Sequence, residues 1–143
     1  MVRGSRGFTM IELMVVIGII GVMTAISIPF YIGYRPKLLL NQASNKVLAS
    51  VRLARAAAVA EARPRTIYFS WDNEAYKIDD GPWIPLGLRV DMAKGEGWTE
   101  DFLSFSPDGK ASTSGRIVFS STAIQEEFEL YVSIAGFTRL RLK

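Results

Sequence analysis

An apolar run near the N-terminus constrains this chain more than any other feature. From Phe8 to Ile28 there are twenty-one residues with a single charged side chain, Glu12. A helix needs about 20 consecutive apolar residues to cross a bilayer, so the run predicts a membrane-spanning helix. A secretory signal peptide would have a shorter apolar core followed by a small-residue cleavage site, whereas here a proline and several aromatic residues follow.

Composition excludes several other classes of protein. The 143 residues contain no cysteine and no histidine, which removes disulfide scaffolds, thiolate metal sites and the commonest general base. The formal net charge is +3, but fifteen basic residues face fourteen acidic ones once residues 1–7 are set aside. The part of the chain that folds is therefore close to neutral and has no overall electrostatic footprint for nucleic acid.

The carboxylate of Glu12 needs an explanation, because a charge at bilayer depth costs about 2.5 to 3.5 kcal/mol on insertion scales. Such a residue is normally paired or functional. The alternative is a carboxylate at the membrane interface that draws in water by local thinning of the bilayer and needs no partner.

Residues around this position carry a specific resemblance. Arg6, Gly7, Phe8 and Thr9, followed by Glu12 and aliphatic residues, resemble the type III signal of type IV pilins and type II secretion pseudopilins. In that family a membrane prepilin peptidase cuts after the glycine, here between Gly7 and Phe8, and methylates the new N-terminus. The resemblance implies a cytoplasmic leader, a single-pass anchor in the inner membrane, and a remainder in the periplasm that later joins a pilus or pseudopilus.

The resemblance also implies a role for Glu12 in assembly. Cleavage would create an α-ammonium on Phe8, and Glu12 would pair with the ammonium of a neighbouring subunit, since a buried charge is tolerated when it has a partner. In pilin filaments the glycine-to-proline stretch can lose helicity, which here corresponds to Gly21 to Pro29. Close packing of these small residues against another helix is the alternative.

The rest of the chain changes its hydrophobic period once. After Pro36, apolar residues recur at helical spacing and predict an amphipathic helix that ends near Arg63 and Pro64, with its stripe facing the core rather than a partner. From Thr66 the period is two. The expected strands are Thr66–Trp71, Tyr76–Ile78, Phe102–Ser106, Arg116–Ser121, Glu127–Ile134 and Thr138–Leu142. Residues 79–101 are expected to form a long surface loop.

The predicted fold class is therefore α+β and pilin-like. A long N-terminal α-helix, membrane-spanning in its first half and amphipathic in its second, packs on an antiparallel β-sheet domain. The expected segments are a cleaved leader (1–7), a transmembrane or filament-core helix (8–34), an amphipathic helix (35–64) and a β-rich domain (65–143). About forty C-terminal residues resemble minor pseudopilins of the GspH, FimT and FimU type, and the lack of paired cysteines favours a minor subunit.

The C-terminal strand raises a second functional possibility. Alternation places Arg139, Arg141 and Lys143 on one face of this strand. In FimT-like minor pilins, a C-terminal Gly-Arg-x-Arg motif is associated with DNA binding. Arg139 and Arg141 match that motif, but Thr138 stands where it has glycine.

A hairpin register offers a competing explanation for these cations. A three-residue loop, Ile134 to Gly136, sets Glu129 opposite Arg141, Glu127 opposite Lys143 and Tyr131 opposite Arg139. On the apolar face, Leu130 then faces Leu140 and Phe128 faces Leu142. Cross-strand charge pairs are an ordinary stabilising device, so we expect a paired, solvated face with only Arg139 lacking a carboxylate partner.

No residues converge on catalysis, a cofactor or a metal site. There is no Gly-x-Ser-x-Gly elbow or phosphate-binding loop, and the acids of residues 79–101 lack EF-hand spacing. We therefore expect a structural minor pseudopilin whose partners are the prepilin peptidase, other pilin or pseudopilin subunits and the inner membrane. A DNA-binding minor pilin is the alternative, and a membrane-anchored domain that does not assemble is a third hypothesis.

Overall fold

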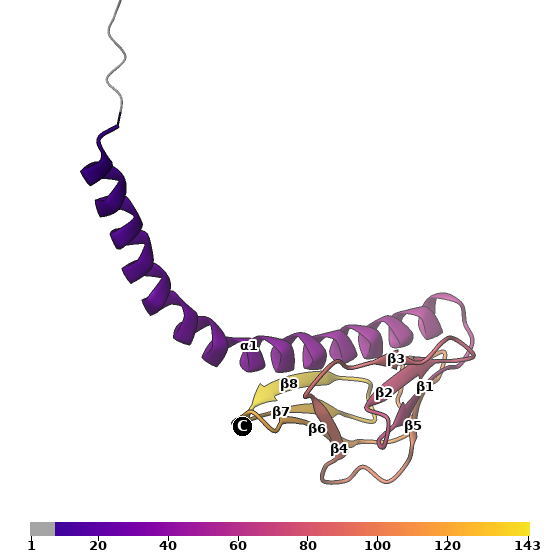
Figure 1. Ribbon diagram of the computed structural model, residues 1–143. Helices are drawn as coiled ribbons and strands as arrows, with labels where there is room; N and C mark the ends of the chain where they lie inside the picture. The colour runs from indigo at the N-terminus through magenta and orange to yellow at the C-terminus, as the bar shows by residue number, and fades with distance from the viewer. Residues whose placement is uncertain (1–7) are drawn as a thin grey trace, which may run out of the picture. The chain divides into compact units, whose positions relative to one another are not determined.

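The computed structural model describes residues 8–143, apart from the side chains of residues 28–33. In this part of the chain one helix, α1 (Met10–Ala60), precedes eight strands (Figure 1). The strands are β1 (Arg65–Ser70), β2 (Ala75–Ile78), β3 (Ile84–Pro85), β4 (Asp91–Lys94), β5 (Phe102–Phe105), β6 (Gly115–Ser121), β7 (Ile124–Val132) and β8 (Thr138–Leu142). The chain divides into two compact units between Arg35 and Pro36.

The N-terminal part of α1 has the properties of a membrane span. Met10–Ser27 is long and apolar enough to cross a bilayer, as judged by its length and composition, and none of it is buried within the chain. The helix continues past Pro29 and Pro36, although proline has no N–H and weakens the helical ladder where it occurs.

The strands form two antiparallel sheets of four strands each. The first sheet has the order β3-β2-β1-β5 and the second has the order β4-β6-β7-β8. Along β6 the burial alternates strictly, from Gly115 to Ser121, as expected for a strand with one face on the core. A long helix followed by antiparallel sheets confirms the predicted α+β, pilin-like fold class.

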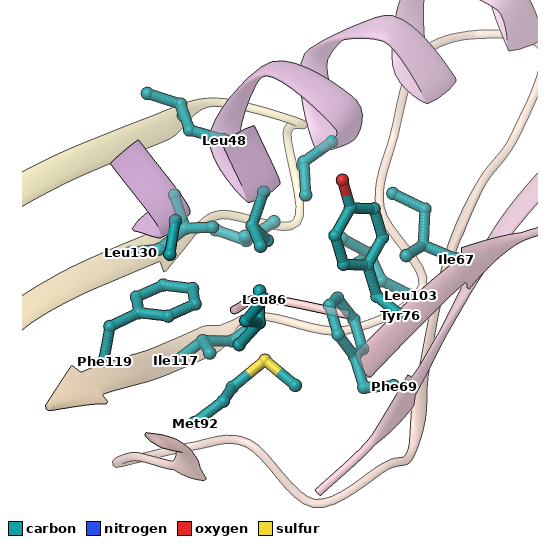
Figure 2. Close-up of a cluster of buried hydrophobic side chains, with 14 of the residues drawn as sticks. Leu48, Ile67, Phe69, Tyr76, Leu86, Met92, Leu103, Ile117, Phe119 and Leu130 are labelled. Carbon is teal, nitrogen blue, oxygen red and sulfur yellow. The ribbon is translucent and has the colours of Figure 1, made fainter. Parts of the chain in front are cut away.

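The hydrophobic core lies between the second half of α1 and both sheets (Figure 2). The helix contributes a stripe of buried residues at spacings of three and four: Leu40, Ala43, Val47, Val51, Ala54 and Ala58. From the sheets, Ile67, Leu103, Ile117 and Leu130 are fully buried against it. The stripe is therefore a core face, as predicted. Each fully buried leucine or valine in it contributes about 1.5 to 3 kcal/mol.

The helix ends at Ala60, earlier than the predicted end near Arg63 and Pro64. Its last turn closes with two hydrogen bonds, from Ala62 N to Val59 O (3.4 Å) and from Arg63 N to Ala58 O (3.2 Å). Ala62 has a left-handed φ of 50°. This is the Schellman pattern, which usually has glycine in the left-handed position. An alanine there gives no sequence signal, which explains the error.

The expectation of an uninterrupted loop over residues 79–101 was wrong. Ile84–Pro85 forms β3 and pairs with β2, and Asp91–Lys94 forms β4 and pairs with β6. Both are edge strands, where a proline is tolerated because one side of the strand makes no ladder bonds. Such strands are too short to show an alternating hydrophobic pattern. Their formation depends instead on the longer strand beside them.

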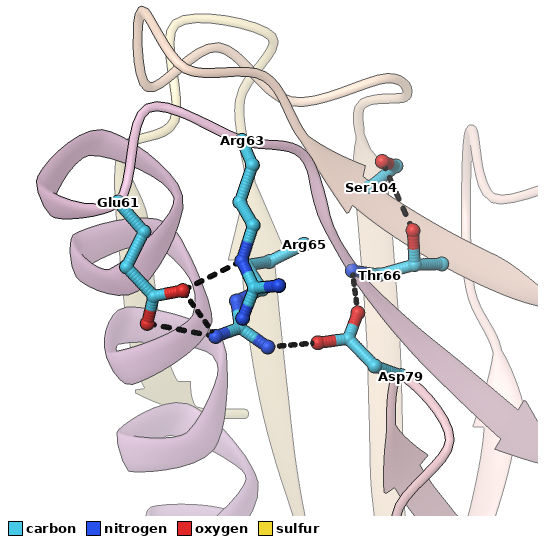
Figure 3. Close-up of polar contacts among 6 residues, drawn as sticks. All are labelled: Glu61, Arg63, Arg65, Thr66, Asp79 and Ser104. Carbon is cyan, nitrogen blue, oxygen red and sulfur yellow. Dashed lines mark hydrogen bonds and ion pairs between the residues drawn. The ribbon is translucent and has the colours of Figure 1, made fainter.

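A polar network joins the end of α1 to the first sheet (Figure 3). Arg65 contacts Glu61 on one side (2.6 Å) and Asp79 on the other (2.5 Å). Asp79 also accepts a hydrogen bond from the backbone N–H of Thr66 (2.8 Å). Burial opposes the charge of Asp79, but the bonds from Thr66 and Arg65 outweigh it and lower the pKa of Asp79. The network fixes the position of the first residues of β1 relative to the end of α1.

Candidate functional site

The first candidate site is the beginning of α1. Thr9 lies before the first helical residue, and its Oγ1 accepts a hydrogen bond from the backbone N–H of Glu12 (3.2 Å). Thr9 and Glu12 therefore have the Thr-x-x-Glu spacing of a helix capping box, in which the threonine satisfies one of the free N–H groups of the first turn. This capping role was not predicted from the sequence, although the Thr-x-x-Glu spacing before an apolar run is its signal.

Glu12 is exposed and makes no ion pair among the residues that the structure describes. Its surroundings are exposed apolar side chains, including Phe8 (76% exposed), Ile11 and Val16. A carboxylate in that setting is well tolerated in water, where it needs no partner, and poorly tolerated in lipid or in a protein filament. Glu12 thus has a charge without a counter-charge among residues 8–143. Gly7 lies outside the described residues.

The expected assembly segment, Gly21 to Pro29, is helical throughout in this chain. A Cβ added at Gly21 would have no heavy atom within 4 Å, and the same holds at Gly18. Within the described chain nothing packs closely on these glycines. Packing inside the described chain therefore does not require glycine at these two positions. The remaining explanations are close contact with another molecule and a locally weakened helix.

The second candidate site is the face of β8 that carries Arg139, Arg141 and Lys143. The register between β7 and β8 confirms the predicted pairs, including Glu129 with Arg141 and Tyr131 with Arg139. The three-residue loop is also confirmed: Ser133 N donates to Phe137 O (2.9 Å), and Gly136 has a φ of 80°.

The expected ion pairs on this face are only partly correct. Lys143 Nζ lies 3.2 Å from Glu127 Oε2, as predicted, and also 3.8 Å from Glu129 Oε1. Arg141 is exposed and forms no ion pair within the described chain, so the expectation that only Arg139 would lack a carboxylate was wrong. The long lysine side chain reaches the diagonal neighbour, which register alone does not reveal.

Other clusters offer no comparable chemistry. Among residues 8–143 no group of three or more Asp, Glu, His or Cys side chains is arranged to hold a metal ion. The tryptophans have structural contacts: Trp98 is buried and packs edge-on against Phe69, and Trp71 donates a hydrogen bond from Nε1 to Asp101 Oδ1 (2.8 Å). Trp83 is half exposed beside the Lys77 ammonium, 5.2 Å from its ring centre.

Comparisons with known proteins agree with both the N-terminal segment and the fold. Residues 2–28 match the prokaryotic N-terminal methylation motif. A fimbrial protein of Pseudomonas aeruginosa is 38% identical over 61 residues, which are 43% of this chain and 39% of that protein. The prepilin peptidase-dependent protein D of Escherichia coli is 63% identical over 36 residues, a quarter of each chain. The alignments thus span at most about two fifths of these relatives.

Two solved structures share the fold. The type IV minor pilin FimU of Pseudomonas aeruginosa aligns with a TM-score of 0.60 and 18% identity, covering 76% of this chain and 92% of FimU. The minor pseudopilin EpsH from the type 2 secretion system of Vibrio cholerae aligns with a TM-score of 0.58 and 11% identity, covering 74% of this chain and 95% of EpsH. At these identities the likeness concerns the fold alone.

The chain therefore combines a match to the N-terminal methylation motif, an apolar helix long enough to cross a membrane, and a β domain whose fold resembles those of a minor pilin and a minor pseudopilin.

Proposed function

We propose that the chain is a minor pseudopilin, cut between Gly7 and Phe8 by a prepilin peptidase, that incorporates into a type II secretion pseudopilus or a type IV pilus. The observation that carries this proposal is the carboxylate of Glu12, which is exposed in an apolar helix and has no ion-pair partner among residues 8–143. The match of residues 2–28 to the methylation motif supports the cleavage.

The physical argument concerns what happens to Glu12 in a filament. When apolar helices pack together, Glu12 leaves water, and an uncompensated buried charge costs several kcal/mol. The α-ammonium created on Phe8 has the opposite sign and comes four residues earlier in each subunit. Pairing between neighbouring subunits satisfies both charges and selects one axial stagger, so Glu12 sets the register of assembly.

The proposal also specifies the topology of the chain, the state of its helix and its position in the filament. The leader is cytoplasmic, α1 anchors the chain in the inner membrane by a single pass, and residues 36–143 lie in the periplasm. Gly21 to Pro29 loses helicity in the filament, which is supported by the helix-weakening residues at both ends and by the open space around Gly21. A minor position in the filament is supported by the fold shared with a minor pilin and a minor pseudopilin.

Intact mass spectrometry of the full chain, made with and without an active prepilin peptidase, tests the processing step. The proposal expects the mass of residues 8–143 plus one methyl group when the peptidase is present, and the full-length mass when it is absent. Gly7→Val is the matched control, because it changes the residue before the cut and leaves the anchor intact. An unchanged mass in the presence of active peptidase would show that the chain is a membrane-anchored domain outside the assembly pathway.

A second function, DNA binding through Arg139 and Arg141, is favoured by one specific observation. Both guanidinium groups are exposed on β8 and neither forms an ion pair within residues 8–143. Positive charge without a carboxylate partner is what phosphate contacts require. Lys143, which contacts Glu127 and Glu129, is the weakest member of the set.

Duplex-DNA binding by the full chain in detergent micelles, titrated with salt, tests this alternative. Changing both arginines to Ala should abolish most of the binding and reduce the salt slope by about 2, one for each phosphate contact. The control changes Lys46 and Arg89 to Ala, which removes two other exposed cations and the same net charge. Equal losses of DNA affinity in the two double variants would show that net charge alone accounts for the binding and that Arg139 and Arg141 do not form a site.

A further inference from the structure

A groove of about 610 Å³ lies between the last turns of α1 and the loop that joins β7 to β8. The helix contributes Arg52, Arg55 and Val59 to its walls, and the loop side contributes Phe137 and Thr138. The volume lies within the range of pockets that hold a small ligand or a peptide side chain. None of the interactions proposed above uses this surface.

The groove is apolar where it meets solvent. Phe137 is 70% exposed and Val59 is 52% exposed, although both side chains are large and apolar. Exposed aromatic residues at the edge of a groove are typical anchor points in protein interfaces, because covering them removes apolar area from water. These two side chains therefore supply an apolar contact for an incoming group.

The walls of the groove are held in place by Arg55. Its Nε donates to Gly109 O (2.9 Å) and its Nη2 donates to Ala135 O (3.3 Å), so one side chain connects α1 to two loops. The guanidinium carbon also lies 5.8 Å from the centre of the Phe137 ring. The groove is thus organised before any partner arrives, which reduces the entropy lost on binding.

The two arginines of the groove have no carboxylate partner among residues 8–143. Arg52 is exposed and donates from Nε to Thr138 Oγ1 (3.2 Å), which leaves the rest of its guanidinium open. Neither Arg52 nor Arg55 forms an ion pair with a carboxylate in the described chain, in contrast to Arg65 and Arg116, which do. A partner that places a carboxylate beside Arg52 would meet an open bidentate donor.

We propose that this groove binds an acidic segment of a partner protein, in which an apolar side chain covers Phe137 and Val59 and a neighbouring carboxylate pairs with Arg52. A nucleic acid fits less well, because the walls offer alanine, valine and phenylalanine, and one open guanidinium cannot follow a phosphate backbone. The inference goes beyond the proposed assembly role, since the groove contains no residue of the apolar segment Met10–Ser27 and does not depend on Glu12.

Fluorescence anisotropy with the full chain in detergent micelles tests the proposal. The probe is a fluorescein-labelled peptide, Asp-Leu-Phe-Glu amide. One control peptide has lysine in place of both acids, and the other has alanine in place of leucine and phenylalanine. Specific binding requires both features, so each control should bind at least about tenfold more weakly, which corresponds to about 1.4 kcal/mol.

Variants of the chain locate the binding. Arg52→Glu should weaken binding of the acidic probe at least about tenfold, because it replaces an attraction with a repulsion. Lys46→Glu is the matched control on the same helix and should change the affinity less than about twofold. Phe137→Ala should weaken binding without changing its salt dependence. Arg52→Gln, which removes the charge without reversing it, covers the case in which the glutamate variant misfolds.

Three outcomes would overturn the proposal. The first is equal binding of the acidic and the lysine peptide, and the second is an equal effect of Arg52→Glu and Lys46→Glu. The third is displacement of the probe by duplex DNA from the wild-type chain but not from the Arg139→Ala, Arg141→Ala double variant, which would assign the groove to a nucleic-acid site. Failure of the Glu12 proposal leaves all three readouts unaffected.

Discussion

Glu129 and Arg141 lie directly opposite each other on β7 and β8, yet no ion pair forms between them. Glu129 is approached instead by Lys143, whose Nζ lies 3.8 Å from Glu129 Oε1. This arrangement keeps the strands in register and leaves the guanidinium of Arg141 exposed, so the β8 face stabilises the hairpin with one cation and presents two others to solvent.

The first prediction separates these cations by their effect on stability. Arg141→Ala should change the free energy of unfolding by less than about 0.5 kcal/mol, because an exposed side chain without a partner contributes little. Lys143→Ala removes two contacts with glutamates and should cost more, up to about 1 kcal/mol. Thermal unfolding of the full chain in detergent micelles measures both. A larger loss for Arg141→Ala would show that Arg141 is held by contacts within the chain.

A second prediction concerns the loop between β7 and β8. Gly136 has a φ of 80°, and a Cβ added there would lie 2.2 Å from Gly109 O and 2.5 Å from Arg55 Nε. Gly136→Ala should therefore push the hairpin away from the helix. Gly97→Ala is the matched control, because Gly97 has nearly the same φ (79°) and the nearest atoms to an added Cβ lie at 3.4 Å, an ordinary van der Waals contact.

The difference between the two glycine variants isolates the clash from the backbone strain that both share. Gly136→Ala should lower the free energy of unfolding by about 2 kcal/mol more than Gly97→Ala, the range expected for overpacking. It should also weaken probe binding in the groove beside it. Equal losses of stability would mean that the loop can shift freely and that the groove is not held in a fixed form.

A third prediction concerns the end of α1. Ala62 occupies the left-handed position of a Schellman motif, with a φ of 50°. Ala62→Gly should raise the free energy of unfolding by about 0.5 to 1 kcal/mol, because glycine adopts this conformation without steric strain. Ala60→Gly, two residues earlier within the helix, should have the opposite sign. A loss of stability on Ala62→Gly, measured by thermal unfolding, would contradict the assigned helix end.

The fourth prediction is a pH dependence from Asp79. Its pKa lies below the ordinary 3.8, since the bonds from Thr66 and Arg65 outweigh burial. The stabilisation from its ionised form is therefore complete above about pH 3.8 and is lost as the pH falls through the lower folded value. Asp79→Asn keeps the acceptor for Thr66 but removes the charge, so it should cost about 1 kcal/mol at neutral pH.

That cost should shrink as the pH falls below 3.8, because the wild-type carboxyl then becomes neutral as well. Unfolding of both chains across the acid range measures the difference. Asp72→Asn is the control, since Asp72 follows β1 and makes no ion pair within the described residues. A difference between wild type and Asp79→Asn that stays constant with pH would show that the charge of Asp79 is not responsible.

Sequence reasoning succeeded where the residues of an element determine it by themselves. The strand Thr138–Leu142 was predicted with its observed bounds, and the register of β7 with β8 followed from alternation and from a glycine in the loop. The core stripe of α1 followed from apolar residues three and four apart.

The errors share a different cause. The short strands β3 and β4 exist because longer strands present free hydrogen-bonding edges beside them, which a local pattern does not contain. The helix end at Ala60 depends on an alanine in a conformation that usually requires glycine. The partner of Glu129 depends on the reach of a lysine side chain, and the groove beside Phe137 depends on two loops that meet only in the folded chain.

Glu12 stands in the capping box of α1 and is proposed to direct assembly, and one substitution separates these two functions. Glu12→Gln removes the charge but keeps a residue that suits the third position of a capping box, so the beginning of α1 should be retained. Thr9→Ala is the complementary control, because it removes the capping oxygen and keeps the carboxylate.

The most direct measurement is the fraction of each variant recovered in sheared pili or pseudopili, relative to the amount in the membrane, in cells that lack the wild-type chain. We expect Glu12→Gln to be cleaved and inserted normally but strongly reduced in filaments, whereas Thr9→Ala should be incorporated close to the wild-type level. Wild-type incorporation of Glu12→Gln would contradict the claim that this carboxylate pairs with the N-terminus of a neighbouring subunit.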